Sequence, residues 1–206
     1  MLLYILGMIG IAAFAISGVI SAGRRNMDIF SIVLLGMVAS LGGGTIRDVV
    51  LRLDAVYWVQ DTSYLWVAFL SSVFAFFGVR VIENRQQVFH YADSFGLALF
   101  TVVATERVLA QGFSPMIAIT MGVITGVAGG IIRDLLSDRV PLVLGKEFYA
   151  TPAFLGALLV VLLEQNMPWH EYNSIYASFL IFILRILAIH KGLYYPSWLL
   201  FKKRDS

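Results

Sequence analysis

Seven apolar stretches, each close to the length of a membrane-spanning helix, dominate this sequence. They cover Leu2–Ala22, Ile29–Leu51, Ser63–Ile82, Ala92–Ala110, Ser114–Leu136, Phe148–Leu163 and Ser174–Ile189. Crossing the hydrocarbon core of a bilayer as a helix takes about 20 apolar residues. Because lipid offers no hydrogen bonds to the backbone, such stretches are expected to form helices, and they lack the alternation of a lipid-facing barrel. The sequence therefore predicts an all-α membrane protein with seven transmembrane helices.

Composition agrees with this class and excludes several others. Of the 206 residues, 59% are hydrophobic and 14% are charged, which is more apolar surface than a soluble domain of this size can bury. Cysteine is absent, so cysteine nucleophiles and thiolate metal sites are excluded, and the three scattered histidines do not suggest a metal site. No catalytic set, phosphate-binding loop or basic groove with interleaved aromatics is visible. We expect no enzymatic activity, no cofactor and no nucleic-acid partner.

The placement of lysine and arginine predicts the orientation of the chain. With the N-terminus outside the cytoplasm, the cytoplasmic side receives 12 of these residues and the outer side three. The 12 are Arg24, Arg25, Arg80, Arg85, Arg133, Arg139, Lys146, Arg185, Lys191, Lys202, Lys203 and Arg204, and the three are Arg47, Arg52 and Arg107. Because cytoplasmic loops are enriched in basic residues, the pattern predicts an outer N-terminus and a cytoplasmic C-terminus.

One motif occurs twice, as GGGTIRDVVL and again as AGGIIRDLLS. A shift of 86 positions superimposes the copies without a gap, and the matched pairs include Gly36 and Gly122, Gly43 and Gly129, Gly44 and Gly130, and Arg47 and Arg133. We therefore expect a single membrane domain over residues 1–206, with one repeat in 1–86, a second in 87–166, and a seventh helix and cytoplasmic tail in 167–206. Because each repeat would hold three helices, the second should be inverted relative to the first, as in many transporters.

The small residues at the centre of each motif predict a local break in the helix. They are Gly42, Gly43 and Gly44 in the first copy and Ala128, Gly129 and Gly130 in the second. Glycine costs about 1 kcal/mol per residue in a helix interior. We expect a kink or a short unwound segment whose free carbonyl groups line a wet cavity as cation ligands. Alternatively, the glycines only let helices approach closely, as small-xxx-small faces do.

Each motif also places an arginine and an aspartate inside an apolar stretch. These are Arg47 and Asp48 in the first copy and Arg133 and Asp134 in the second. Residues i and i+1 do not face each other on a helix, so we expect partners on other helices. Arg47 should lie toward the outer mouth and, by inversion, Arg133 toward the inner mouth. Each arginine then either extends to the headgroups as an interfacial residue, or guards a vestibule against cations or holds an anionic lipid headgroup.

Four further polar residues are candidates to line a hydrated path, namely Ser17, Thr45, Asp93 and Thr125. Serine and threonine within helices more often bond to their own backbone. Asp93 stands at the start of the fourth apolar stretch, where it either caps the helix or lies at a pore mouth.

The doubled G-G-x-I-R-D motif within seven apolar stretches resembles the bacterial branch of the trimeric intracellular cation (TRIC) channel family, which has also been described as glycine-transporter-like. The resemblance covers nearly the whole chain. It implies a homotrimer in the bacterial inner membrane, one pore per protomer, conduction of K⁺ and also Na⁺, and a pore lined by glycine-kinked second and fifth helices. Animal members bind phosphoinositide at a basic motif in the fifth helix, for which Arg133 is the counterpart here, although a bacterial membrane makes that lipid an unexpected ligand.

A passive, K⁺-permeable channel is thus the function we expect. Arg47 and Arg133 would tune the field or the gating, with Asp48 and Asp134 as counter-charges. Selectivity should be modest, because no filter of the TVGYG kind is present. Two alternatives stay open. A secondary transporter of a small solute such as glycine would use the same inverted repeat, and a non-conducting scaffold would use the glycines for packing alone.

Overall fold

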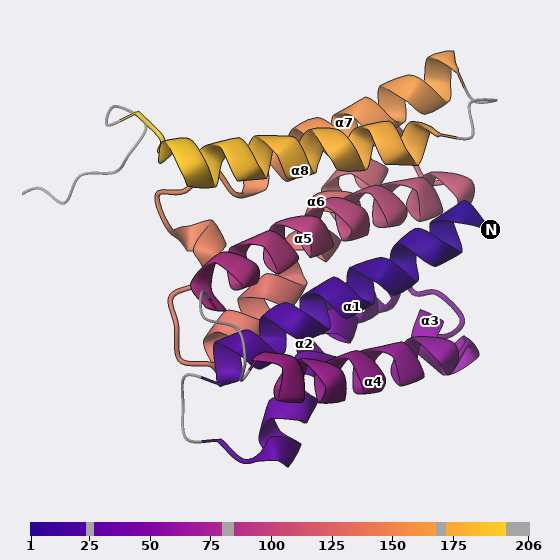
Figure 1. The fold of residues 1–206 in the computed structure, drawn as a ribbon. Helices are drawn as coiled ribbons and strands as arrows, with labels where there is room; N and C mark the ends of the chain where they lie inside the picture. Colours follow the sequence, from indigo (N-terminus) through magenta and orange to yellow (C-terminus); the bar gives the residue numbers. More distant parts are fainter. Residues whose placement is uncertain (24–26, 80–84, 168–171, 197–206) are drawn as a thin grey trace, which may run out of the picture.

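A computed structural model describes residues 1–23, 27–79, 85–167 and 172–196, and these form a bundle of helices (Figure 1). The elements are α1 (Leu2–Ala22), α2 (Ile29–Val50), α3 (Tyr57–Gln60), α4 (Ser63–Gly78), α5 (Arg85–Ala110), α6 (Pro115–Leu136), the 3₁₀ turn η2 (Leu142–Leu144), α7 (Ala150–Asn166) and α8 (Asn173–Lys191). α1 packs against α2, α4 and α5, while α5 packs against α6, α7 and α8. The long helices lie side by side, with α4 on one side of the bundle and α7 and α8 on the other (Figure 1).

The protein is an all-helical membrane protein, and five of its described helices are long and apolar enough to span a bilayer. These are α1, α2, α5, α6 and α8. α4 and α7 are apolar but have 16 and 17 residues, so the structure supports five of the seven predicted spans by length.

The predicted start of the fourth span was wrong, because α5 begins at Arg85 rather than at Ala92. Its first two turns are polar and escape a hydropathy criterion. They are held instead by side-chain pairs one turn apart, Gln86 with His90 at 2.7 Å and Gln87 with Tyr91 at 2.8 Å, as i and i+4 neighbours on a helix can be.

The predicted orientation stays a prediction. Six of the basic residues on which it rests lie outside the described part of the chain, namely Arg24, Arg25, Arg80, Lys202, Lys203 and Arg204. The end of the predicted cytoplasmic tail, residues 197–206, also lies outside it.

Contacts at the centre of the bundle recur at the spacing of 86. Gly10 on α1 lies against the ring of Phe100 on α5, and Gly96 on α5 lies against the ring of Phe14 on α1. The two phenylalanine rings are 5.3 Å apart between centroids. Residue numbers rise along α1 as they fall along α5, so these two helices run antiparallel.

The glycine motifs lie where α2 crosses α6. A Cβ on Gly43 would clash with the carbonyl oxygen of Thr125, and a Cβ on Gly129 would clash with that of Ala39. Both pairs are again related by 86 positions. The prediction was a kink or an unwound segment. An unwound segment is wrong, because α2 and α6 are α-helical through their glycines, whereas a kink stays a prediction. The two helices approach closely here, and the glycines allow this contact.

The two motifs end their helices in the same way. Beyond α2 the Leu53 N–H donates to the Asp48 carbonyl oxygen at 3.0 Å, and beyond α6 the Arg139 N–H donates to that of Asp134 at 2.8 Å. The residue before each donor has a left-handed backbone, with φ 54° at Arg52 and 52° at Asp138. Such a residue lets the chain turn back over the last helical turn.

Candidate permeation site

Arg47 and Asp48 form a buried ion pair at the end of α2. The shortest separation is 2.6 Å, from Arg47 Nη2 to Asp48 Oδ1, and the two residues are 4% and 2% exposed. The Tyr57 N–H donates to Asp48 Oδ2 at 2.8 Å. The expectation that neighbours in sequence would not pair was therefore wrong. The Nε and Nη2 atoms of Arg47 both reach Asp48 Oδ1, and the connector that follows the helix supplies the Tyr57 N–H to the same carboxylate.

Arg133 repeats this arrangement at the end of α6 and adds partners on other helices. Its Nε donates to Asp134 Oδ1 at 2.8 Å, and the Leu142 N–H donates to Asp134 Oδ2 at 3.1 Å. Its Nη1 donates to Ser17 on α1 at 3.1 Å and also to Asp93 on α5. Arg133 is 0% exposed, so its side chain does not extend to the headgroups, and the anionic lipid expected there stays a prediction.

Asp93 lies inside α5, fully buried, so the interpretation as a helix cap was wrong. Its Oδ1 accepts from Arg133 and also from the Tyr149 hydroxyl at 3.1 Å, while its Oδ2 has no hydrogen-bond partner among the described residues. Arg185 on α8 lies over the Tyr149 ring, 4.6 Å from its centroid. Sequence reasoning missed Tyr149 and gave Arg185 no role in a site. The signal for Arg185 was a lone charge inside the last apolar stretch.

The other predicted site residues have smaller roles. Ser17 donates to the Phe14 carbonyl oxygen at 2.9 Å, and Thr45 donates to that of Leu41 at 2.8 Å while accepting from Trp58. The Thr125 hydroxyl is buried without a partner. The remaining motif residues pack: Gly42 on Ile132, Gly44 on Tyr57, and Gly130 on Tyr149, with Ala128 buried.

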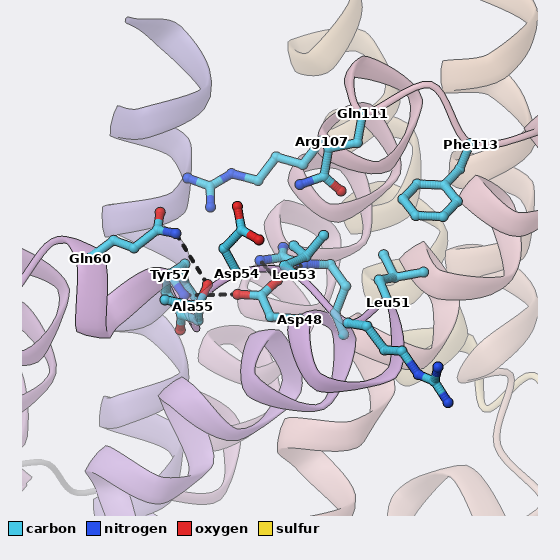
Figure 2. A pocket seen from close by; sticks show the side chains of 12 residues that line it. Asp48, Leu51, Leu53, Asp54, Ala55, Tyr57, Gln60, Arg107, Gln111 and Phe113 are labelled. Atoms are coloured by element: carbon cyan, nitrogen blue, oxygen red, sulfur yellow. Dashed lines mark hydrogen bonds and ion pairs between the residues drawn. The ribbon is translucent and has the colours of Figure 1, made fainter.

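A polar cavity opens beside the Arg47–Asp48 pair (Figure 2). Its volume is about 540 Å³, and its lining includes Arg47, Asp48, Arg52, Asp54, Tyr57, Gln60, Arg107 and Gln111. A second cavity of about 10 Å³ shares Arg47, Tyr57 and Arg107 with it and reaches inward to Ile11 and Phe100. Burial raises the pKa of the Tyr57 phenol in the connector, so this group is neutral at physiological pH. We call the larger cavity the vestibule and the smaller one the neck.

The predicted charged residues thus form two clusters rather than one site. The Arg47 cluster consists of Arg47, Asp48 and also Arg107, which sequence reasoning did not name as a site residue, and the Arg133 cluster consists of Arg133, Asp134 and Asp93. The buried Phe14–Phe100 pair, with Phe14 1% exposed, packs at the centre of the bundle between the two clusters. Among the described residues no group of three or more His, Asp or Glu side chains could hold a metal ion.

Membrane-spanning helices with ionised side chains buried between them are typical of a channel or transporter. Comparison with known proteins supports this class and gives the family. A sequence model described as "Glycine transporter" matches residues 4–80 and 90–165, two segments that begin 86 positions apart. The chain belongs to this family, the bacterial TRIC family.

Three relatives illustrate the similarity. A UPF0126 membrane protein of Vibrio cholerae is 44% identical over 158 residues, which is 76% of this chain and 66% of that protein. The UPF0126 inner membrane protein YadS of Escherichia coli is 37% identical over 203 residues, 97% of this chain and 98% of YadS. The crystal structure of the trimeric intracellular cation channel orthologue from Rhodobacter sphaeroides superimposes with a TM-score of 0.89 at 38% identity, covering 93% of this chain and 99% of that one.

Proposed function

We propose that this protein is a passive channel for monovalent cations, K⁺ first and Na⁺ also, with one path in each protomer. The observation that carries the proposal is the pair of buried charge clusters in one helix bundle, one on each side of the packed Phe14 and Phe100 rings. The solved relative described as a cation channel has the same fold. Buried charges in membrane helices mark ion pathways more often than they stabilise a fold.

The path that we propose begins at the vestibule, passes the neck and the Phe14–Phe100 pair, and continues to the Arg133 cluster. α1, α2, α5 and α6 line it, since they contribute the charged and aromatic residues along this route. The glycines hold α2 against α6 and so fix the spacing of the path. Opening then requires the two phenylalanine rings to separate.

The proposal includes an architecture of two inverted repeats with α4 and α7 as the third helix of each, which makes seven spans with α8. The antiparallel contacts related by 86 positions support it. We also propose a homotrimer, because the Rhodobacter relative is described as trimeric, and an inner-membrane location like that named for YadS. The N-terminus and the vestibule would then face outward and the C-terminus the cytoplasm.

Single-channel recording tests the function. Purified protein is placed in a planar bilayer under a KCl gradient, and glycine is then added on one side. We expect discrete current steps that reverse near the K⁺ equilibrium potential and do not respond to glycine. Repeating the gradient with NaCl should again give steps, because the path has no rigid filter of stacked carbonyls.

The second candidate is a secondary transporter of a small zwitterion, which the description of the family model favours. Its substrate carboxylate would have to reach a cationic group in the membrane, and Arg107 in the vestibule is one such group. Silent bilayers together with saturable glycine uptake into liposomes would establish this function and reject the channel.

A further inference from the structure

Among the residues of the two clusters, two have no charged counterpart at the spacing of 86. The counterpart of Asp93 in the first repeat is Gly7, and the counterpart of Arg107 is Ser21. Gly7 and Arg47 both line the neck, so the first repeat has a glycine at the position where the second has the carboxylate that pairs with Arg133. The Arg47 cluster therefore carries a formal charge of +1, from two arginines and one aspartate. The Arg133 cluster carries −1, from one arginine and two aspartates.

The excess positive charge lies on Arg107. Its Nη2 donates to the Tyr64 hydroxyl at 2.7 Å, and its guanidinium lies 5.9 Å and 5.7 Å from the ring centroids of Tyr57 and Tyr64. Among the described residues no carboxylate pairs with it. Arg47, in contrast, is neutralised by Asp48. A guanidinium has five N–H donors, so most of those on Arg107 are left without an acceptor in the described part of the chain.

Arg107 lines both the vestibule and the neck. Figure 2 shows its side chain extended across the cavity over Asp54 and Tyr57, with the amide of Gln111 on the same wall. When Arg52 and Asp54 are also counted, the residues that line the vestibule carry a formal net charge of +1. The volume of about 540 Å³ is ample for a small oxyanion with its waters. Tyr57 also lines the vestibule, and its hydroxyl is buried without a hydrogen-bond partner among the described residues.

We propose that the vestibule is a binding site for a small oxyanion, a carboxylate or a phosphate, held by Arg107. The planar guanidinium of Arg107 can donate two parallel hydrogen bonds to two oxygens of such a group. The aromatic rings of Tyr57 and Tyr64 hold the guanidinium in place. The bound anion cancels the positive charge at the neck. If the channel function proposed above is right, occupancy favours the entry of cations, but binding itself does not depend on conduction.

Isothermal titration calorimetry on the purified protein in detergent tests the site. Sodium acetate and sodium phosphate are titrated separately at a constant ionic strength set with NaCl. We expect saturable binding of at least one, weakened tenfold or more in Arg107→Gln and less in Arg107→Lys, which keeps the charge but loses the fork. Lys191→Gln, which removes one positive charge from the exposed end of α8, should bind like the unaltered protein.

The two arms identify the ligand class, since acetate probes a carboxylate site and phosphate a phosphate site. Absence of saturable heat with both anions would overturn the proposal, and so would unchanged binding in Arg107→Gln. Loss of binding in all three variants would show that the effect is not local to Arg107 and would overturn it too. Binding in a protein that gives no current would leave the site standing and reject only the channel.

Discussion

At the scale of single residues, Arg133 is important because its charged guanidinium is fully buried. It donates hydrogen bonds to the carboxylates of Asp134 and Asp93 and to the hydroxyl of Ser17, which lie on three different helices. Taking a guanidinium out of water is costly, and only close partners offset that cost. The cluster is therefore sensitive to the loss of any one member.

Arg133→Gln should destabilise the fold by about 3–5 kcal/mol, because it leaves Asp93 and Asp134 buried without a counter-charge. The measurement is thermal unfolding in detergent, with Lys146→Gln at an exposed position as the matched control. Asp93→Asn in the Arg133→Gln background should recover part of the loss, because the double variant buries one charge fewer. Equal melting temperatures for Arg133→Gln and the control would contradict the claim that the buried ion pairs of Arg133 stabilise the fold.

Gly43→Ala and Gly129→Ala should each destabilise the protein by about 1–3 kcal/mol, the usual cost of overpacking. The added methyl group would meet a carbonyl oxygen of the facing helix, a rigid atom that cannot turn aside. Gly78→Ala is the control, since a Cβ there has nothing within 4 Å. A larger loss at one of the two positions than at the other would show that the repeats do not share the contact equally.

At the scale of elements, α2 and α6 are each followed by a left-handed turn residue that is not glycine. Arg52 and Asp138 adopt left-handed backbone angles, which cost an ordinary residue about 1–2 kcal/mol and for which glycine is better suited. The same strain at corresponding positions of the two repeats indicates that the turn itself is required, because it brings the following connector onto Asp48 and Asp134.

Arg52→Gly should therefore be about 1 kcal/mol more stable than Arg52→Ala, since both lose the side chain and only alanine keeps the strained Cβ. Differential scanning of the two purified variants measures this difference directly. An alanine variant as stable as the glycine variant would mean that the left-handed angle at this position costs nothing.

Sequence reasoning predicted the elements well where apolar pattern alone decides. The range Leu2–Ala22 matches α1. The predicted ranges of α2 and α6 each differ from the observed helix by one residue, at the C-terminal end of α2 and at the N-terminal end of α6. It failed in the first turns of α5, where hydrogen bonds between side chains support a helix that is too polar for an apolar pattern to reveal. It also failed between α2 and α6, where close contact of the two helices offsets the free-energy cost of glycine in a helix. The partners of Arg133 were also beyond it, because no pattern in one sequence shows that Asp93 on another helix lies beside it.

At the scale of the whole molecule, the orientation in the membrane is open to a clean experiment because the chain has no cysteine. Gln111→Cys places a thiol at the vestibule, and Lys146→Cys places one at an exposed site beyond η2. We expect a membrane-impermeant maleimide to label the first in spheroplasts and the second only after lysis, as the distribution of basic residues predicts. The reverse pattern would turn the whole bundle over, and with it the side that the vestibule faces.

The unequal charges of the two clusters also make the proposed path act as a rectifier. A path with −1 at one end and +1 at the other concentrates cations at its negative end. In symmetric KCl, the current carried from the Arg133 end should exceed the current carried from the Arg47 end at equal and opposite voltages. Arg107→Gln should bring this ratio toward one, and a wild-type ratio of one would show that the exchange of an aspartate for a glycine and of a serine for an arginine leaves the current unaffected. Two halves of similar shape would thus conduct unequally because the charges of their two clusters differ.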